Sequence, residues 1–164
     1  MIRRIAPDDQ EDLDNVRELF LEYAGSLGQF GNAICFPTFM QEVAELPGAY
    51  APPGGDFLMA FTAGPVATLA GCAAFRSLAP KIAEMKRLYI RPAYRSTGLG
   101  KDLTLAIAAA AQRAGHKVLR LDTLPQMAGA IGLYRALGFQ PIPAYGGNPP
   151  EALCFELRLS KTIR

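Results

Sequence analysis

The chain has 164 residues, of which 50% are hydrophobic and 20% are charged, and its formal net charge is +2. This length and apolar content suit one globular domain, so we expect a single domain over residues 1–164. The near balance of charges disfavours a nucleic-acid-binding protein, because such proteins usually carry a large basic excess.

The first third of the chain predicts one strand and two helices. A short strand at residues 3–6 is followed by an acidic pair at 8–9. Acidic side chains favour a helix start because they face the positive end of the helix dipole. Apolar residues then recur at helical spacing until Gly28. A second helix is predicted over residues 36–46, and the Gly- and Pro-rich stretch 47–55 is predicted as a loop.

An uncharged stretch over residues 57–75 is nearly long enough to span a bilayer. Gly64 and Pro65 lie in its middle, and this dipeptide marks a turn. We therefore predict two buried strands, at 57–63 and 66–76, and no membrane helix.

The rest of the chain alternates strands and helices. A long strand at 82–91 is followed by a helix that ends near Ala114, and a further helix spans 127–137. Later strands are predicted at 118–122, 139–143 and 152–159. This order predicts an α+β fold with α/β/α layers, in which about four helices cover a mixed, mostly antiparallel central sheet of six to seven strands. We expect antiparallel pairs early in the chain and parallel pairs around the last helices.

The segment between the strand at 82–91 and the next helix has the composition of an anion-binding loop. Gly98 and Gly100 remove side chains where an anion must approach the backbone. The first N–H groups of the following helix lack partners within that helix, and Arg95 and Lys101 add positive charge. A diphosphate is the natural ligand of this arrangement, and a plain turn before an Ala-rich core helix stays open as the alternative.

Two other phosphate-binding motifs fit the segment less well. A nucleotide P-loop needs a glycine five residues before Gly100 and Ser or Thr after the lysine, whereas the chain has Arg95 and Asp102 there. A dinucleotide fingerprint would start with the two glycines of the loop, and Asp122 lies 22 residues beyond Gly100 (122 − 100). However, Leu103 occupies the position of the third glycine. A dinucleotide-dependent oxidoreductase stays open as an alternative.

Two sequence blocks resemble the GNAT superfamily of acyl-CoA N-acyltransferases. Residues 95–100, with the sequence RSTGLG, are similar to the Arg/Gln-x-x-Gly-x-Gly/Ala pattern of that superfamily, and they follow a strand that runs into Pro92. Residues 130–139, with the sequence AIGLYRALGF, are similar to its A-x-x-L-Y-x-x-L-G-F signature. The resemblance implies a GNAT-like fold over nearly the whole chain and acetyl-CoA as the acyl donor.

The resemblance also implies which residues bind the cofactor. Backbone groups of the strand end would pair with the pantetheine amides as an added strand does, and backbone N–H groups of the loop would hold the pyrophosphate. The implied residues are Leu88, Tyr89, Ile90, Arg95, Ser96, Thr97, Gly98, Leu99, Gly100 and Lys101. Two positions depart from the pattern. Ser96 replaces a common glycine, which is tolerable if this residue needs no positive φ, and Met127 replaces an asparagine that contacts pantetheine in some members.

Acetyl transfer to an amine needs a base that takes the ammonium proton and a donor that protonates the leaving thiolate. We predict Glu84 as the base, directly or through a water, because alternation along its strand places it on one face with Lys86, Leu88 and Ile90. A surface carboxylate paired with a neighbouring cation of the strand is the alternative. Tyr134 is predicted as the acid, as the resemblance implies, and core packing on an apolar helix face is its alternative.

The acceptor site is predicted between the segment 29–50 and the loop that begins at Tyr145. Its aromatic residues suggest a partly apolar pocket: Phe30, Phe36, Phe39 and Tyr145. Arg76 and Arg87 are candidates for binding an acceptor carboxylate, although we expect them to be solvated charges at strand ends. His116 is interpreted as a solvated residue at a helix end and not as a catalyst.

The leading hypothesis is an enzyme that moves the acetyl group of acetyl-CoA directly to a primary amine of a small molecule or an amino acid. A non-catalytic CoA-binding sensor of the same fold is the main alternative. Three widely spaced cysteines, without a CxxC pair or a Cys/His cluster, favour a cytoplasmic protein with no disulfide framework and no metal site. We expect a small-molecule amine as partner and neither nucleic acid nor membrane, and the sequence leaves open whether the chain forms a homodimer.

Overall fold

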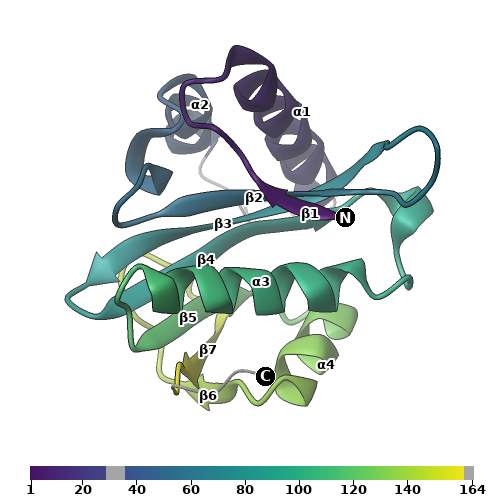
Figure 1. Ribbon diagram of the computed structural model, residues 1–164. Coiled ribbons are helices and arrows are strands. Elements are labelled where there is room, and N and C mark those ends of the chain that lie inside the picture. The colour runs from purple at the N-terminus through teal and green to yellow at the C-terminus, as the bar shows by residue number, and fades with distance from the viewer. Residues whose placement is uncertain (29–35, 161–164) are drawn as a thin grey trace.

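The computed structural model describes residues 1–28 and 36–160, and Figure 1 shows a twisted sheet with helices on both faces. The strands are β1 (Ile2–Arg4), β2 (Asp56–Phe61), β3 (Leu69–Ala79), β4 (Ile82–Ile90), β5 (Val118–Thr123), β6 (Gln140–Ile142) and β7 (Leu153–Arg158). The helices are α1 (Gln10–Leu27), α2 (Phe36–Ala44), α3 (Leu99–Arg113) and α4 (Ala128–Ala136), with short 3₁₀ turns η2 (Gly48–Tyr50) and η3 (Pro92–Tyr94). These elements confirm the predicted α+β class. None of the described helices is long and apolar enough to cross a membrane.

The sheet has the strand order β1-β2-β3-β4-β5-β7-β6. Neighbouring strands are antiparallel, except that β4 and β5 are parallel. The expectation of parallel pairs around both last helices is therefore wrong for the second helix. Although β6 follows α4, it does not pair with β5, because β7 lies between them and is antiparallel to both.

Each face of the sheet is covered by its own pair of helices. Alternate side chains of a strand point to opposite faces, so the strands contribute apolar residues to a core on each side of the sheet. One core lies against α3 and α4 and includes Phe75, Met85, Ile107, Leu121 and Phe155. The other lies against α1 and α2 and includes Phe20, Phe39, Phe57, Met59 and Cys72. Small buried residues of α3, among them Ala108 and Ala111, let this helix lie close to the strands.

His116 is buried, with 6% of its surface exposed, so its interpretation as a solvated residue is wrong. The chain turns back at the end of α3, where the His116 N–H donates to the Ala111 carbonyl. The imidazole then lies edge-on to Phe75 at 5.9 Å between ring centroids, and its Nε2 is 3.1 Å from the Gly54 carbonyl oxygen. The loop before β2 therefore covers a side chain that the helix end alone would leave in solvent.

Candidate active site

The parallel strands β4 and β5 pair over only three residues each. Residues 82–84 pair with 118–120, and no pairing between these two described strands continues beyond that point. The remainder of β4, residues 85–90, therefore presents an unpaired edge toward β5. An edge of this kind binds an extended, amide-bearing chain through backbone hydrogen bonds.

Arg87 forms a bulge in β4. Its φ is +59°, and the register with β3 shifts so that two residues of β4 oppose one residue of β3. Before the bulge Glu84 and Lys86 face α2, whereas after it Leu88 and Ile90 pack against the core under α3. The prediction that these four residues share one face is wrong, because the extra residue reverses the alternation.

A pocket of about 1220 Å³ lies over the divergence of β4 and β5. Its walls are α2 and the turn after it, β4, β5, the start of α4 and the loop between β6 and β7. It includes parts of both segments predicted for the acceptor, whereas Gln29, Phe30 and the side chain of Phe36 lie outside the description. Tyr134 belongs to the core under α3 and α4 and also lines the pocket, so the pocket reaches through the gap between the strands.

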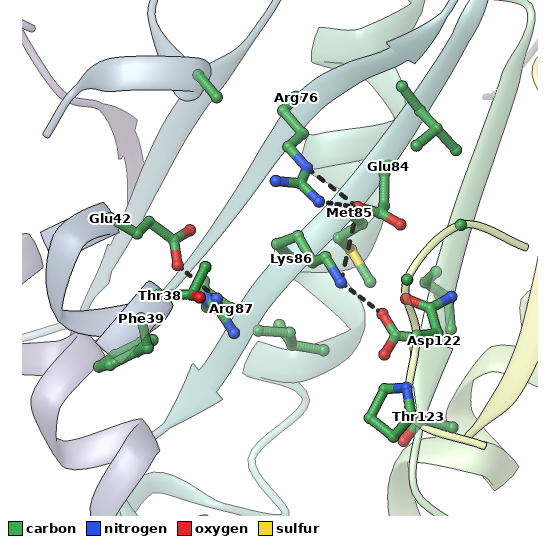
Figure 2. Close-up of a pocket in the computed structure, with 18 of the residues that line it drawn as sticks. Thr38, Phe39, Glu42, Arg76, Glu84, Met85, Lys86, Arg87, Asp122 and Thr123 are labelled. Atoms are coloured by element: carbon green, nitrogen blue, oxygen red, sulfur yellow. Dashed lines mark hydrogen bonds and ion pairs between the residues drawn. The ribbon is translucent and has the colours of Figure 1, made fainter. Parts of the chain in front are cut away.

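Glu84 lies in this pocket and is 1% exposed. Its Oε1 accepts hydrogen bonds from Arg76 Nη2 at 2.8 Å and Nε at 3.1 Å, and Lys86 Nζ is 3.6 Å from the same oxygen (Figure 2). The surface-carboxylate alternative is therefore wrong about exposure. Arg76, on β3 directly opposite Glu84, is its ion-pair partner, and 38% of the Arg76 side chain remains exposed to solvent.

Lys86 also bridges the two diverging strands. Its Nζ lies 2.7 Å from Asp122 Oδ1 on β5, beyond the last paired residues (Figure 2). From the sequence, Asp122 was a candidate only as the acidic residue of a dinucleotide fingerprint, and its pairing with Lys86 was not predicted. The signal that would have found the pair is that both residues face the same side of neighbouring strands.

Arg87 is held from the other wall of the pocket. Its guanidinium donates to Glu42 on α2 and lies 5.0 Å from the ring centroid of Phe39 and 5.7 Å from that of Tyr23. Glu42 also accepts from the Tyr50 hydroxyl. Only 16% of the Arg87 side chain is exposed, so the expectation of a solvated strand-end charge is wrong for Arg87.

Two tyrosines face the pocket from the C-terminal part of the chain. Burial raises the pKa of Tyr134 above its ordinary value, so its phenol stays protonated at neutral pH. The Tyr145 hydroxyl is buried and has no hydrogen-bond partner among the described residues. Burial raises the pKa of Tyr145, and so does the nearby Glu84 carboxylate, although the two groups are not in hydrogen-bonding geometry. A buried hydroxyl without a hydrogen bond lowers the stability of the folded protein by about 1–3 kcal/mol, and a ligand that hydrogen-bonds to it would remove this penalty.

The predicted phosphate loop joins η3 to α3. Gly98 caps the helix with φ +90°, and Ser96 has φ +62°, so the condition that Ser96 needs no positive φ is not met. The first bond of the helix runs from the Asp102 N–H to the Gly98 carbonyl at 3.0 Å. Within the described structure, no backbone N–H of residues 96–101 donates to another protein group. The helix therefore begins with several free N–H groups, as an anion site requires.

The match to known proteins covers most of the chain. Residues 15–139 match the model of the Acetyltransferase (GNAT) family. The chain belongs to this family. An uncharacterized N-acetyltransferase of Schizosaccharomyces pombe is 35% identical over 153 residues, which are 92% of this chain and 91% of that protein.

Two solved structures extend the family comparison. A Klebsiella pneumoniae protein, provisionally assigned as an acyl-CoA N-acyltransferase, is 27% identical with a TM-score of 0.71, over 98% of this chain and 97% of that one. Salmonella typhimurium YncA, solved with its cofactor acetyl-CoA, shares the fold at 20% identity with a TM-score of 0.67, over 100% and 96% of the two chains. The GNAT-like architecture predicted from the sequence is thus confirmed.

Proposed function

We propose that this GNAT protein moves the acetyl group of acetyl-CoA directly to a primary amine of a small molecule or an amino acid. One observation carries the proposal. The unpaired edge of β4 joins the free N–H groups of residues 96–101 to a pocket that contains a buried carboxylate. The family membership and the acetyl-CoA bound by the Salmonella structure of the same fold support the choice of donor.

The described residues fit this donor. The backbone of Leu88, Tyr89 and Ile90 would pair with the amides of its pantetheine arm. The free N–H groups of residues 96–101 would bind its diphosphate, with the charge of Lys101 nearby. Arg95 Nε donates to the Ile90 carbonyl at 3.0 Å and so orders the loop, and the rest of its guanidinium would add positive charge for the diphosphate. Met127 lines the pocket where some family members use an asparagine, so that contact is absent from the proposed set.

Glu84 and Tyr134 take the two proton-transfer roles. Glu84 removes the ammonium proton, directly or through a water, and its Oε2 is the oxygen left for this task because Oε1 is bound to cations. The neutral nitrogen then forms a bond to the thioester carbon, and the C–S bond breaks as Tyr134 protonates the leaving sulfur. The proton that the nitrogen loses on becoming an amide restores the Tyr134 phenol, directly or through a water. Since burial raises the pKa of Tyr134, this group should cause no alkaline decline of kcat below its ordinary pKa of about 10.

Calorimetry tests the donor. Acetyl-CoA should bind saturably, and the absence of heat at millimolar ligand would remove the proposal. Binding of NADH without binding of CoA would favour the oxidoreductase alternative instead.

Tyr134→Phe separates an enzyme from a CoA sensor. We expect about a 100-fold loss of kcat with an unchanged Kd for acetyl-CoA, because the variant removes only the proton donor. The melting temperature serves as the control, since the Tyr134 hydroxyl makes no hydrogen bond in the described structure. A sensor predicts tight CoA binding and no thiol release with any amine, for both the parent chain and the variant.

A further inference from the structure

We infer that the acceptor carries a second positive charge and no anionic group, which is the chemistry of an alkyl diamine or polyamine. The inference rests on the proposed function and narrows its acceptor class. It excludes the amino-acid acceptors that the proposed function allows.

The cations of the pocket are the first line of evidence. Each of the three is already paired with a carboxylate: Arg76 with Glu84 at 2.8 Å, Lys86 with Asp122 at 2.7 Å, and Arg87 with Glu42 (Figure 2). Among the described residues, every cation of the pocket is therefore already in an ion pair, and of their buried nitrogen atoms only Arg87 Nε is left without a hydrogen-bond partner. Drawing one of these cations toward an acceptor anion would weaken the ion pairing of a partly or fully buried carboxylate, which is unfavourable.

The carboxylates of the pocket are the second line of evidence. Five line it: Glu42, Glu45, Glu84, Asp122 and Glu151. Against three cations this leaves a lining charge of −2 (3 − 5). Residues 29–35, which belong to the segment predicted for the acceptor and lie outside the description, contain no charged side chain. The field of the pocket therefore favours a cation over a neutral or anionic acceptor.

The two carboxylates without a cation lie at the mouth of the pocket. Glu45 follows α2 and Glu151 belongs to the loop between β6 and β7, and both are exposed with no ion-pair partner among the described residues. Deeper in, the partnerless Tyr145 hydroxyl lies near the buried Glu84. A primary amine at this inner end would donate to both groups, and a second ammonium on the same chain would then face the acidic mouth.

Three acceptors with one four-carbon chain test the charge at the far end. The assay measures thiol release from acetyl-CoA with 1,4-diaminobutane, butylamine and 4-aminobutanoate at low ionic strength. A single opposite charge a few ångströms away in a water-exposed site changes affinity about three- to fivefold, and salt screens it. We expect kcat/KM for the diamine to exceed that of butylamine by about tenfold. The two equivalent amines of the diamine account for only a factor of about two, so the remainder measures the effect of the second charge. We expect 4-aminobutanoate to fall below butylamine, and added salt should narrow both gaps.

The outcomes separate this inference from the proposed function. If 4-aminobutanoate is acetylated as well as the diamine, the inference is overturned and the proposed function stands. If no amine releases thiol while acetyl-CoA binds, the proposed function fails and the inference fails with it.

Charge-neutralising variants locate the effect. Glu45→Gln and Glu151→Gln should each lower kcat/KM about threefold for the diamine and by a smaller factor for butylamine, whose single charge lies at the inner end. Glu11→Gln is the matched control, because it removes the same charge from an exposed position on α1 outside the pocket. An equal loss in all three variants would overturn the local assignment, since it would reflect only the net charge of the protein.

Discussion

The phosphate loop and the acceptor pocket are built in different ways. The loop at residues 96–101 presents free backbone N–H groups that are adjacent in sequence, and glycine spacing and a helix start suffice to place them; we propose that they bind the diphosphate of the donor. The pocket acts through side chains from several elements, held by ion pairs such as Lys86 with Asp122, which are 36 residues apart. A change in the loop should therefore alter binding of the donor, whereas a change in the pocket should alter turnover or the choice of acceptor.

The largest expected effect tests the pocket half of this comparison. Glu84→Gln keeps the size of the side chain but cannot take a proton, so kcat should fall at least about 100-fold. The Kd for acetyl-CoA should stay within about twofold. Thiol-release kinetics and calorimetry give the two quantities.

The matched control for Glu84→Gln is Glu156→Gln. Glu156 accepts from Arg120 at 2.9 Å across β7 and β5, so it is also part of a cross-strand ion pair, but it does not line the pocket. It should retain the parent rate. An equal loss of rate in both variants would show that Glu84 matters only for holding strands together.

The loop half of the comparison is tested by Gly98→Ala, with an intermediate effect. Alanine at φ +90° is strained by about 1–2 kcal/mol, and nothing in the protein lies within 4 Å of the added Cβ, so the strain acts without a clash. Because the free loop of the variant can relax out of the strained conformation that the donor requires, the Kd for acetyl-CoA should rise about tenfold while kcat at saturation is retained. Gly25→Ala in α1 also enters open space but at an ordinary helical φ, and should leave both quantities unchanged. A Gly98→Ala protein with normal affinity and a lowered kcat would reverse the assignment of roles.

The smallest expected effect concerns Ser96, which adopts φ +62° without being glycine. Ser96→Gly relieves the left-handed strain but adds freedom to the unfolded chain, so the free energy of unfolding should rise by only about 0.5 kcal/mol. Ser96→Ala keeps the strain and should give no gain. Urea unfolding of the two variants side by side measures the difference, and an equal response would mean that the loop is not strained at this position.

Much of the fold follows from local patterns. Helical periodicity, glycine and proline positions and apolar runs place the helices and strands within a few residues of those observed, and the resemblance to a known family supplies the arrangement of the sheet. The helix start and the free N–H groups of residues 96–101 are predictable for the same reason, since they depend on consecutive residues.

The pocket was less predictable, because its geometry depends on contacts between distant segments. No glycine marks the bulge at Arg87 in the sequence. The bulge nevertheless places Leu88 and Ile90 on the opposite face of the sheet from Glu84. The pairing of Arg76 with Glu84 needs the exact register of β3 and β4, which no local pattern fixes. His116 was misjudged for a similar reason, since a distant loop covers it.

The short contact between β4 and β5 divides the sheet into two panels, one formed by β1 to β4 and the other by β5, β7 and β6. Three residue pairs at one end connect the two parts, and the ion pair of Lys86 with Asp122 connects them past the last of these pairs. A ligand with amide groups that lies between the two strands would form the backbone hydrogen bonds that β4 and β5 do not form with each other. A ligand bound between β4 and β5 would then stabilise the folded protein. The backbone amide hydrogens of both parts of the sheet would exchange with solvent more slowly in the complex than in the free protein.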